Sequence, residues 1–178
     1  MHLLCEDKIL LTFESVQSKY AILTATLIEK GLTISTMESC TAGLIASLIT
    51  DLDGASKVMK GSFVTYSNEA KIACGVSEKV IEKFGVYSKE TAVEMAKNCK
   101  KAYSASIGVG VTGTLGTLDP NNKDSALGEV YFAIDCDGDI KVFYLEVENQ
   151  GSKFLNKVYT AEKICDELLM IVNKNEGC

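Results

Sequence analysis

The chain has 178 residues, a formal net charge of −6, and 47% apolar and 24% charged residues. These values are typical of one globular domain, which we expect to span residues 1–178. The acidic balance argues against nucleic acid as the main partner, because phosphate backbones are held by clustered basic residues. No apolar stretch approaches the roughly 20 residues of a membrane span, and the N-terminus does not follow a signal-peptide pattern.

Cysteine and histidine usage limits the possible chemistry. Seven cysteines, without any C-x-x-C pair, are typical of reduced thiols in a cytoplasmic protein. The single histidine is His2, close to the N-terminus. Zinc sites and Ser-His-Asp or Cys-His arrangements therefore lack their central residue, and we expect neither a metal nor an organic cofactor. Any hydrolytic chemistry must use another base.

Helical and strand patterns alternate along the sequence. Apolar spacing predicts a helix over 6–30, a strand over 32–37 and a helix over 41–52. A strand over 62–66, helices over 68–73, 78–84 and 88–103, strands over 107–112, 129–135 and 140–148, and a helix over 152–173 follow. This order predicts an α/β fold, a three-layer α/β/α arrangement with a mixed, mostly parallel sheet and one antiparallel hairpin. The amphipathic terminal helices suit a homodimer interface.

The segment Glu38-Ser39-Cys40-Thr41-Ala42-Gly43 lies between a predicted strand and a predicted helix. Free N–H groups and the positive end of the helix dipole at such a place favour an anion or a carbonyl oxygen. Alternatively, Ser39 or Thr41 only caps the helix, and Gly43 only allows close packing. Cys40 has no histidine to activate it, which favours a buried structural thiol.

The segment Thr65-Tyr66-Ser67-Asn68-Glu69-Ala70-Lys71 combines a helix start with a lysine. If Ser67 is the N-cap, Tyr66 and Lys71 occupy the two positions that pack together in a hydrophobic staple. Lys71 would then lie near the positive helix end, where its pKa should fall toward that of a usable base. Such an amine suits removal of a proton from a serine hydroxyl.

A third segment, Gly108-Val109-Gly110-Val111-Thr112-Gly113, matches G-x-G-x-x-G. These residues form a predicted strand and not the turn that opens a helix, so the match does not indicate a dinucleotide site. The stretch from Gly113 to Leu127 has no predicted element, and loops of this length are usually functional. It is the first candidate for a substrate loop.

Together with Gly54-Ala55-Ser56, these segments resemble the C-terminal amidase domain of the CinA family, from about Gly31 to Glu148. The resemblance implies hydrolysis of nicotinamide mononucleotide to nicotinic acid mononucleotide and ammonia. It also implies that Ser56 is the nucleophile, that Lys71 is its base, that Tyr66 assists, and that Thr112 contributes a hydroxyl. Substrate contacts are expected from Ser39, Cys40, Thr41, Gly43, Asn68, Gly113 and Lys153. Spacing alone favours a capping role for Ser56 and a solvated Lys71.

The chain departs from the family pattern at two places. Residues 114–120 and 124–128 replace a loop rich in glycine and proline. Lys153 stands where the family has an arginine that is expected to meet the substrate phosphate, and lysine lacks the bidentate fork of arginine. The match corresponds to the stand-alone form, without an additional N-terminal domain. Two alternatives stay open: a catalytically silent binding domain of the same fold, and an amidase for another small carboxamide.

Overall fold

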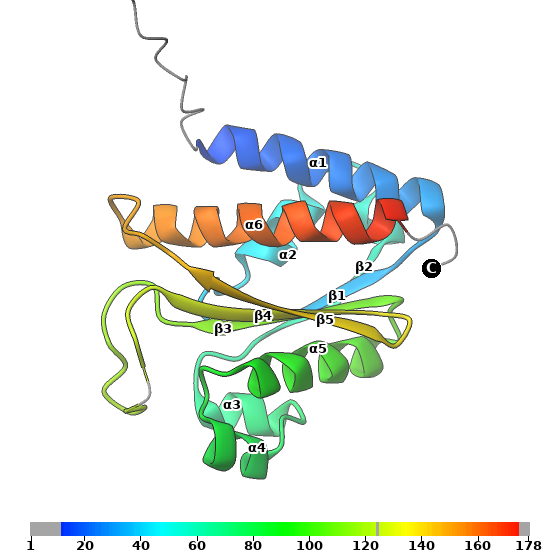
Figure 1. The fold of residues 1–178 in the computed structure, drawn as a ribbon. Coiled ribbons are helices and arrows are strands. Elements are labelled where there is room, and N and C mark those ends of the chain that lie inside the picture. Colours follow the sequence, from blue (N-terminus) through cyan, green and yellow to red (C-terminus); the bar gives the residue numbers. More distant parts are fainter. Residues whose placement is uncertain (1–11, 124, 175–178) are drawn as a thin grey trace, which may run out of the picture.

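A mixed five-stranded sheet lies at the centre of the computed structural model, which describes residues 12–123 and 125–174 (Figure 1). The strands are β1 (Ile34–Glu38), β2 (Met59–Val64), β3 (Ile107–Gly113), β4 (Glu129–Cys136) and β5 (Asp139–Glu146). Their order is β2-β1-β3-β4-β5, with β2, β1 and β3 parallel and β4 antiparallel to both of its neighbours. All strands except β4 therefore run in one direction. The predicted mixed, mostly parallel sheet with its β4–β5 hairpin is confirmed.

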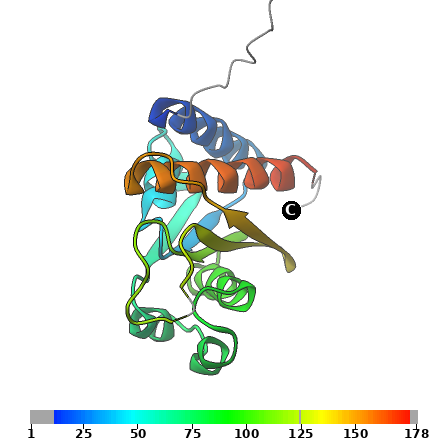
Figure 2. The same ribbon diagram turned by 60° about the vertical axis from the view of Figure 1, so that its left-hand side comes forward.

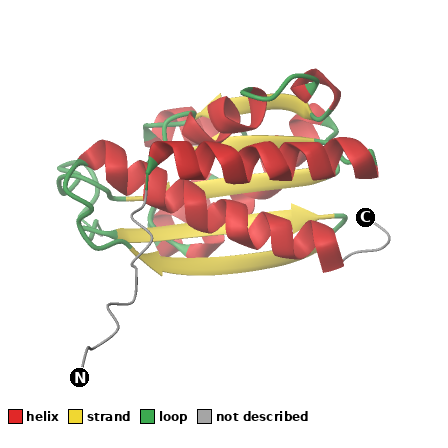
Figure 3. Cartoon of the chain, turned by 90° about the horizontal axis from the view of Figure 1, so that it is seen from above, coloured by secondary structure: helices red, strands yellow, loops and turns green. Residues whose placement is uncertain are grey.

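Helices cover both faces of the sheet. They are α1 (Phe13–Lys30), α2 (Leu44–Thr50), α3 (Asn68–Ala73), α4 (Glu78–Phe84), α5 (Lys89–Tyr103) and α6 (Lys153–Lys174), with a short 3-10 helix η1 (Ala55–Lys57). Figures 1 and 2 show α1, α2 and α6 on one face and α3, α4 and α5 on the other. The two long helices α1 and α6 pack against each other above the sheet (Figure 3). This confirms the three-layer arrangement.

Close packing of α5 explains the glycines of β3. A Cβ atom on Gly108 would collide with the carbonyl oxygen of Ala96, and one on Gly110 with that of Ala92. Both carbonyls belong to α5, so the two glycines let this helix lie directly on the central strand. The G-x-G-x-x-G match is therefore a strand, as predicted, and the structure adds that its glycines pack against α5.

The ends of the elements differ from the predicted ones at a few places. Helix α1 begins at Phe13 with Thr12 as its N-cap, and the predicted start at 6–11 lies outside the described residues, as do His2, Cys5 and Cys178. No disulfide joins the cysteines within 12–123 and 125–174. In the same ranges, no helix combines the length and apolar character that crossing a membrane requires.

Candidate active site

The carboxyl ends of β1 and β2 bring two of the singled-out segments together. The strands are parallel neighbours, and Glu38 at the end of β1 is in register with Val64 at the end of β2. Ser39 directly follows β1, and Lys71 lies on α3, the helix that directly follows β2. Side chains at the carboxyl ends of adjacent parallel strands converge at one edge of the sheet, where ligands of open α/β sheets bind.

Lys71 reaches Ser39 at this edge. Its Nζ atom lies 3.1 Å from Ser39 Oγ and 2.9 Å from the carbonyl oxygen of Thr65, to which it donates. The lysine is only 1% exposed and Ser39 only 5% exposed. A buried amine in contact with a serine hydroxyl is the arrangement in which a lysine can activate a serine as a nucleophile.

Burial changes the protonation of Lys71. Loss of solvation lowers its pKa from 10.5 to about 8, an effect that the nearby Cys40 and Asp119 partly oppose. At a pKa of about 8, roughly a tenth of this amine is uncharged at pH 7 and able to accept a proton, and this fraction rises with pH. The predicted fall in pKa is confirmed, although its main cause is burial and not the helix dipole. Ser67 is the N-cap of α3 as predicted, since its hydroxyl accepts from the Ala70 N–H at 3.1 Å.

The expected pairing of Ser56 with Lys71 is wrong. Ser56 is an exposed residue of η1, which precedes the amino end of β2, whereas Lys71 follows its carboxyl end. The strand between them has six residues and is about 17 Å long at the usual rise per residue, so the two residues flank opposite ends of β2. Lys71 contacts Ser39 instead, so the serine of the Glu38–Gly43 segment takes the place that the resemblance gave to Ser56.

A buried carboxylate shapes the turn that carries Ser39. Glu38 is fully buried, and its two oxygens accept five hydrogen bonds. The donors are the hydroxyls of Thr36 and Thr41 and the N–H groups of Gly43, Ile45 and Ala46, at 2.7–3.1 Å. The carboxylate thus occupies the N-terminus of α2, where the sequence had suggested an external anion. Thr41 and Gly43 hold this carboxylate and do not line the site, which corrects their expected role as substrate contacts.

The Glu38 arrangement gives a test of stability. Replacing Glu38 with glutamine would turn an amide NH2 toward backbone donors, so we expect Glu38→Gln to lower the free energy of unfolding by about 3 kcal/mol. Urea unfolding would measure the change. Glu29→Gln, at an exposed position of α1, is the matched control and should change stability by less than about 0.5 kcal/mol. An equally small change for Glu38→Gln would contradict the assigned role.

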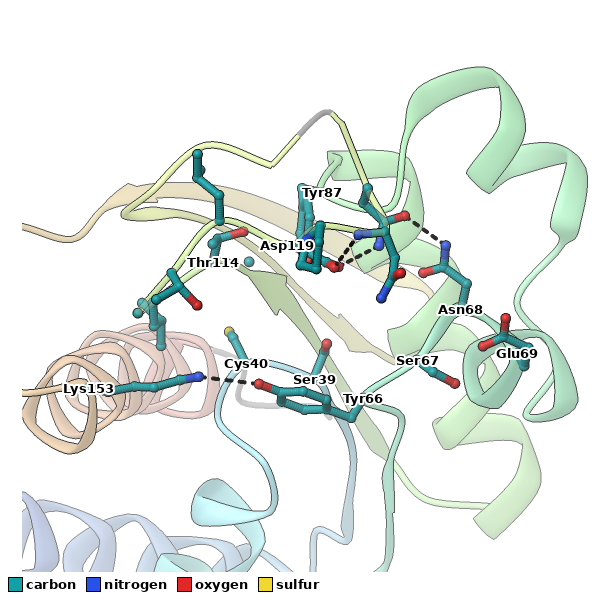
Figure 4. Close-up of a pocket in the computed structure, with 18 residues that line it drawn as sticks. Ser39, Cys40, Tyr66, Ser67, Asn68, Glu69, Tyr87, Thr114, Asp119 and Lys153 are labelled. Atoms are coloured by element: carbon teal, nitrogen blue, oxygen red, sulfur yellow. Dashed lines mark hydrogen bonds between the residues drawn. The ribbon is translucent and has the colours of Figure 1, made fainter.

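A cavity of about 470 Å³ opens beside Ser39 (Figure 4). It is lined by Ser39, Cys40, Tyr66, Ser67, Asn68, Glu69, Tyr87, residues 113–122 and Lys153. Of the expected substrate contacts, Ser39, Cys40, Asn68, Gly113 and Lys153 line the cavity. Burial raises the pKa of the Cys40 thiol to about 12, which excludes a thiolate nucleophile at neutral pH and agrees with a structural thiol.

The loop between β3 and β4 forms one wall of the cavity, as expected for a substrate loop. Asp119 organises it by accepting hydrogen bonds from the Tyr87 hydroxyl at 2.7 Å, from Asn122 Nδ2 at 2.5 Å and from the Asn121 N–H at 2.9 Å. Asn68 Nδ2 donates to Asn122 Oδ1 at 2.8 Å and so ties the loop to α3. Sequence reasoning missed Asp119 and Tyr87, because their positions in the chain give no sign that they meet.

The expected role of Thr112 is also not supported. Its side chain is fully buried, donates to the carbonyl oxygen of Val86 at 3.0 Å, and does not line the cavity. Thr114, two residues later, does line the cavity, and its buried hydroxyl has no hydrogen-bond partner in the described part of the chain. Thr112 therefore has a structural role, and Thr114 is a residue that the sequence analysis overlooked.

Tyr66 and Lys153 form the opposite wall. Lys153 Nζ donates to the Tyr66 hydroxyl at 3.3 Å, and Tyr66 is 64% exposed (Figure 4). A Cβ atom on Gly116 would lie 2.7 Å from Cδ of Lys153, so the glycine leaves room for this lysine beside the loop. Tyr66 thus contacts Lys153 at the cavity wall, whereas Lys71 lies buried behind Ser39. A staple contact between Tyr66 and Lys71 was predicted, but the hydrogen bonds of these side chains go elsewhere, from Lys153 to Tyr66 and from Lys71 to Ser39.

Comparisons with known proteins agree with this architecture. The family model described as the CinA C-terminal domain matches residues 16–166. The chain belongs to the CinA family. It is 40% identical over 141 residues to a putative competence-damage inducible protein of Clostridium acetobutylicum, a match that covers 79% of this chain and 34% of the relative. A CinA-like protein of Kosmotoga olearia is 40% identical over 128 residues, covering 71% and 31% of the two chains. The chain thus spans about a third of the length of these CinA relatives.

Solved CinA structures share the fold. The competence/damage inducible protein CihA from Agrobacterium tumefaciens superposes with a TM-score of 0.79 at 28% identity, covering 97% of this chain and 99% of that one. A CinA superfamily protein from Klebsiella pneumoniae gives a TM-score of 0.83 at 20% identity over 90% of this chain, and it supports the fold alone. Within 12–123 and 125–174, no group of three or more His, Cys, Asp or Glu residues could hold a metal ion.

Proposed function

We propose that this CinA domain hydrolyses the carboxamide of nicotinamide mononucleotide through an acyl-enzyme on Ser39. The observation that carries the proposal is the 3.1 Å contact between Ser39 Oγ and the buried amine of Lys71, beside a cavity. The names of the relatives specify no substrate. The choice of nicotinamide mononucleotide rests on the sequence resemblance and on a cavity that presents a lysine and several hydroxyl groups.

The proposed reaction begins with proton transfer from Ser39 to the uncharged Lys71 amine while Oγ attacks the carboxamide carbon. The tetrahedral intermediate then loses ammonia as the C–N bond breaks and the Lys71 ammonium returns the proton to the leaving nitrogen. Water hydrolyses the resulting ester in the same way, with Lys71 taking its proton. The acyl–oxygen bond then breaks, the Lys71 ammonium returns this proton to Ser39 Oγ, and the carboxylate product leaves.

Backbone N–H groups beside Ser39 suit the negative oxygen of the intermediate. Glu38 takes the N–H groups of Gly43, Ile45 and Ala46, which leaves those of Cys40 and Thr41. Within the described ranges, neither of these two N–H groups donates to another residue. An N–H group directly after the nucleophile is a common oxyanion donor. We assign this task to the two amides, in place of Thr112.

Lys153 and Tyr66 suit the other end of the substrate. Lys153 is exposed at the cavity wall, where its positive charge can meet a phosphate. Tyr66 contacts Lys153, and we assign it to substrate binding, in place of the proton transfer expected from the sequence.

An ammonia assay tests the proposal directly. Purified protein incubated with nicotinamide mononucleotide should release ammonia and nicotinic acid mononucleotide in equal amounts, measured by a coupled assay and by chromatography. Stabilisation by the nucleotide in a thermal shift experiment, without ammonia release, would instead indicate a binding domain. Ammonia release only from other carboxamides would keep the Ser39 chemistry and reject the substrate.

A further inference from the structure

The cavity carries charges of both signs that form no ion pair with each other. Among the described residues, Lys153 donates to the Tyr66 hydroxyl, and the partners of Asp119 are a hydroxyl, an amide and a backbone N–H. Glu69 also lines the cavity and adds a second negative charge. Neither Lys153 nor Asp119 forms a salt bridge within the described part of the chain. In the view of Figure 4, Ser39 lies between them, with Lys153 and Tyr66 on one side and Asp119 and Tyr87 on the other. The cavity is therefore polarised across the nucleophile.

Asp119 is held as a fixed negative charge. Hydrogen bonds, the one from Asn122 above all, lower the pKa of its carboxyl group. The carboxylate is thus ionised at neutral pH, and its three donors fix its position on the loop wall. All three donors are neutral groups, so they orient the charge without cancelling it. The buried Lys71 amine, which forms no salt bridge with Asp119 among the described residues, contributes a smaller share of the fall in this pKa.

We propose that Asp119 selects a ligand whose carboxamide-bearing ring is positively charged, so that the cavity fits a zwitterion with a cationic ring and an anionic phosphate. This inference rests on the proposed function and adds a specificity-determining residue to it. The pyridinium ring of nicotinamide mononucleotide has this charge. The phosphate meets Lys153, the carboxamide meets Ser39, and the ring lies toward Asp119.

Two features of the wall support a cationic ring at this position. A carboxylate in a partly enclosed cavity is screened less than a surface charge, so an unpaired one favours a cation. Tyr87 lines the same cavity, and an aromatic side chain offers a second favourable surface for a cationic ring. A neutral ring of the same shape would leave Asp119 partly desolvated without compensation.

The test compares two ligands that differ in ring charge. Nicotinamide mononucleotide and its reduced dihydro form share the phosphate and the carboxamide, but the reduced ring is neutral. Their affinities are measured by isothermal titration calorimetry on Ser39→Ala protein, which prevents turnover. The oxidised form should bind about tenfold more tightly, the size of effect expected for one partly screened charge pair. In Ser39→Ala/Asp119→Asn protein the two affinities should become equal within about twofold.

Asp139→Asn, at the exposed first position of β5, is the matched control for loss of one negative charge and should keep the tenfold preference. The ratio of the two affinities distinguishes an effect of the lost charge from damage to the loop. A loosened loop would weaken the binding of both ligands alike and leave this ratio unchanged. An unchanged ratio in the Asp119 variant, equal affinities in the parent protein, or no binding of either ligand would each overturn the inference. Ammonia release without this charge selectivity leaves the proposed function standing, whereas charge-selective binding without ammonia release rejects the function alone.

Discussion

Ser39→Ala should reduce ammonia release by a factor on the order of 10³ or more, because it removes the only hydroxyl in contact with the Lys71 amine in the described part of the chain. Ser56→Ala should leave the rate within about twofold of the wild type, since Ser56 is exposed at the other end of β2. The two substitutions make the same chemical change. They therefore form a matched pair that differs only in position.

Both variants would be assayed for steady-state ammonia release, with thermal unfolding as the check that each is folded. Neither substitution removes a large buried group, so both melting temperatures should stay close to that of the wild type. Loss of activity in Ser56→Ala together with an active Ser39→Ala protein would restore the pairing implied by the sequence resemblance and reject the Ser39 assignment.

The arrangement of elements was largely predictable from the sequence. Apolar periodicity located the strands that became β3, β4 and β5, and the caps Ser67 and Ser88 marked the starts of α3 and α5. The helix expected over 41–52 begins only at Leu44. The preceding residues form a turn in which Ala42 and Gly43 have φ angles of 54° and 89°, and periodicity carries no information about such a turn.

The contact between Ser39 and Lys71 was harder to predict, because spacing along the chain does not say at which end of a strand a residue lies. Ser56 and Lys71 flank β2 on opposite sides, so their closeness in sequence is misleading. One available signal was overlooked: Ser39 and Lys71 each follow a strand, and the carboxyl ends of neighbouring parallel strands meet at one edge. Which strands are neighbours is a tertiary property, so the sequence alone did not show that this rule applies to Ser39 and Lys71.

The role of Glu38 shows a second limit of prediction from the sequence. A strand followed by a helix predicts an anion near the helix N-terminus, and the structure has one, supplied by the chain itself. The sequence shows that a carboxylate is present but not that it folds back onto the helix. Because Glu38 fills this place, the proposed nucleotide substrate would have to place its phosphate elsewhere, and Lys153 is the basic residue that lines the cavity.

The pH dependence of activity should report the protonation of Lys71. Only the uncharged amine can accept the Ser39 proton, so kcat/KM should rise about tenfold per pH unit below the pKa and level off above it. With the pKa lowered to about 8 by burial, the bend should lie near pH 8. Lys71→Met should lose activity by a factor on the order of 10³ at every pH and show no such bend. Lys57→Met, at an exposed position of η1, should keep the wild-type profile.

Stability provides an independent readout of the same group. The folded protein holds the Lys71 proton less tightly than the unfolded chain does, with a pKa of about 8 against 10.5. The unfolded state therefore binds more protons in this window, and stability must rise with pH there. Denaturant unfolding at several pH values should show the free energy of unfolding of the wild type increasing, relative to Lys71→Met, between about pH 8 and 10.5. A difference that stays constant across this range would mean that Lys71 has an ordinary pKa, and an amine with an ordinary pKa could not serve as the base for Ser39 near neutral pH.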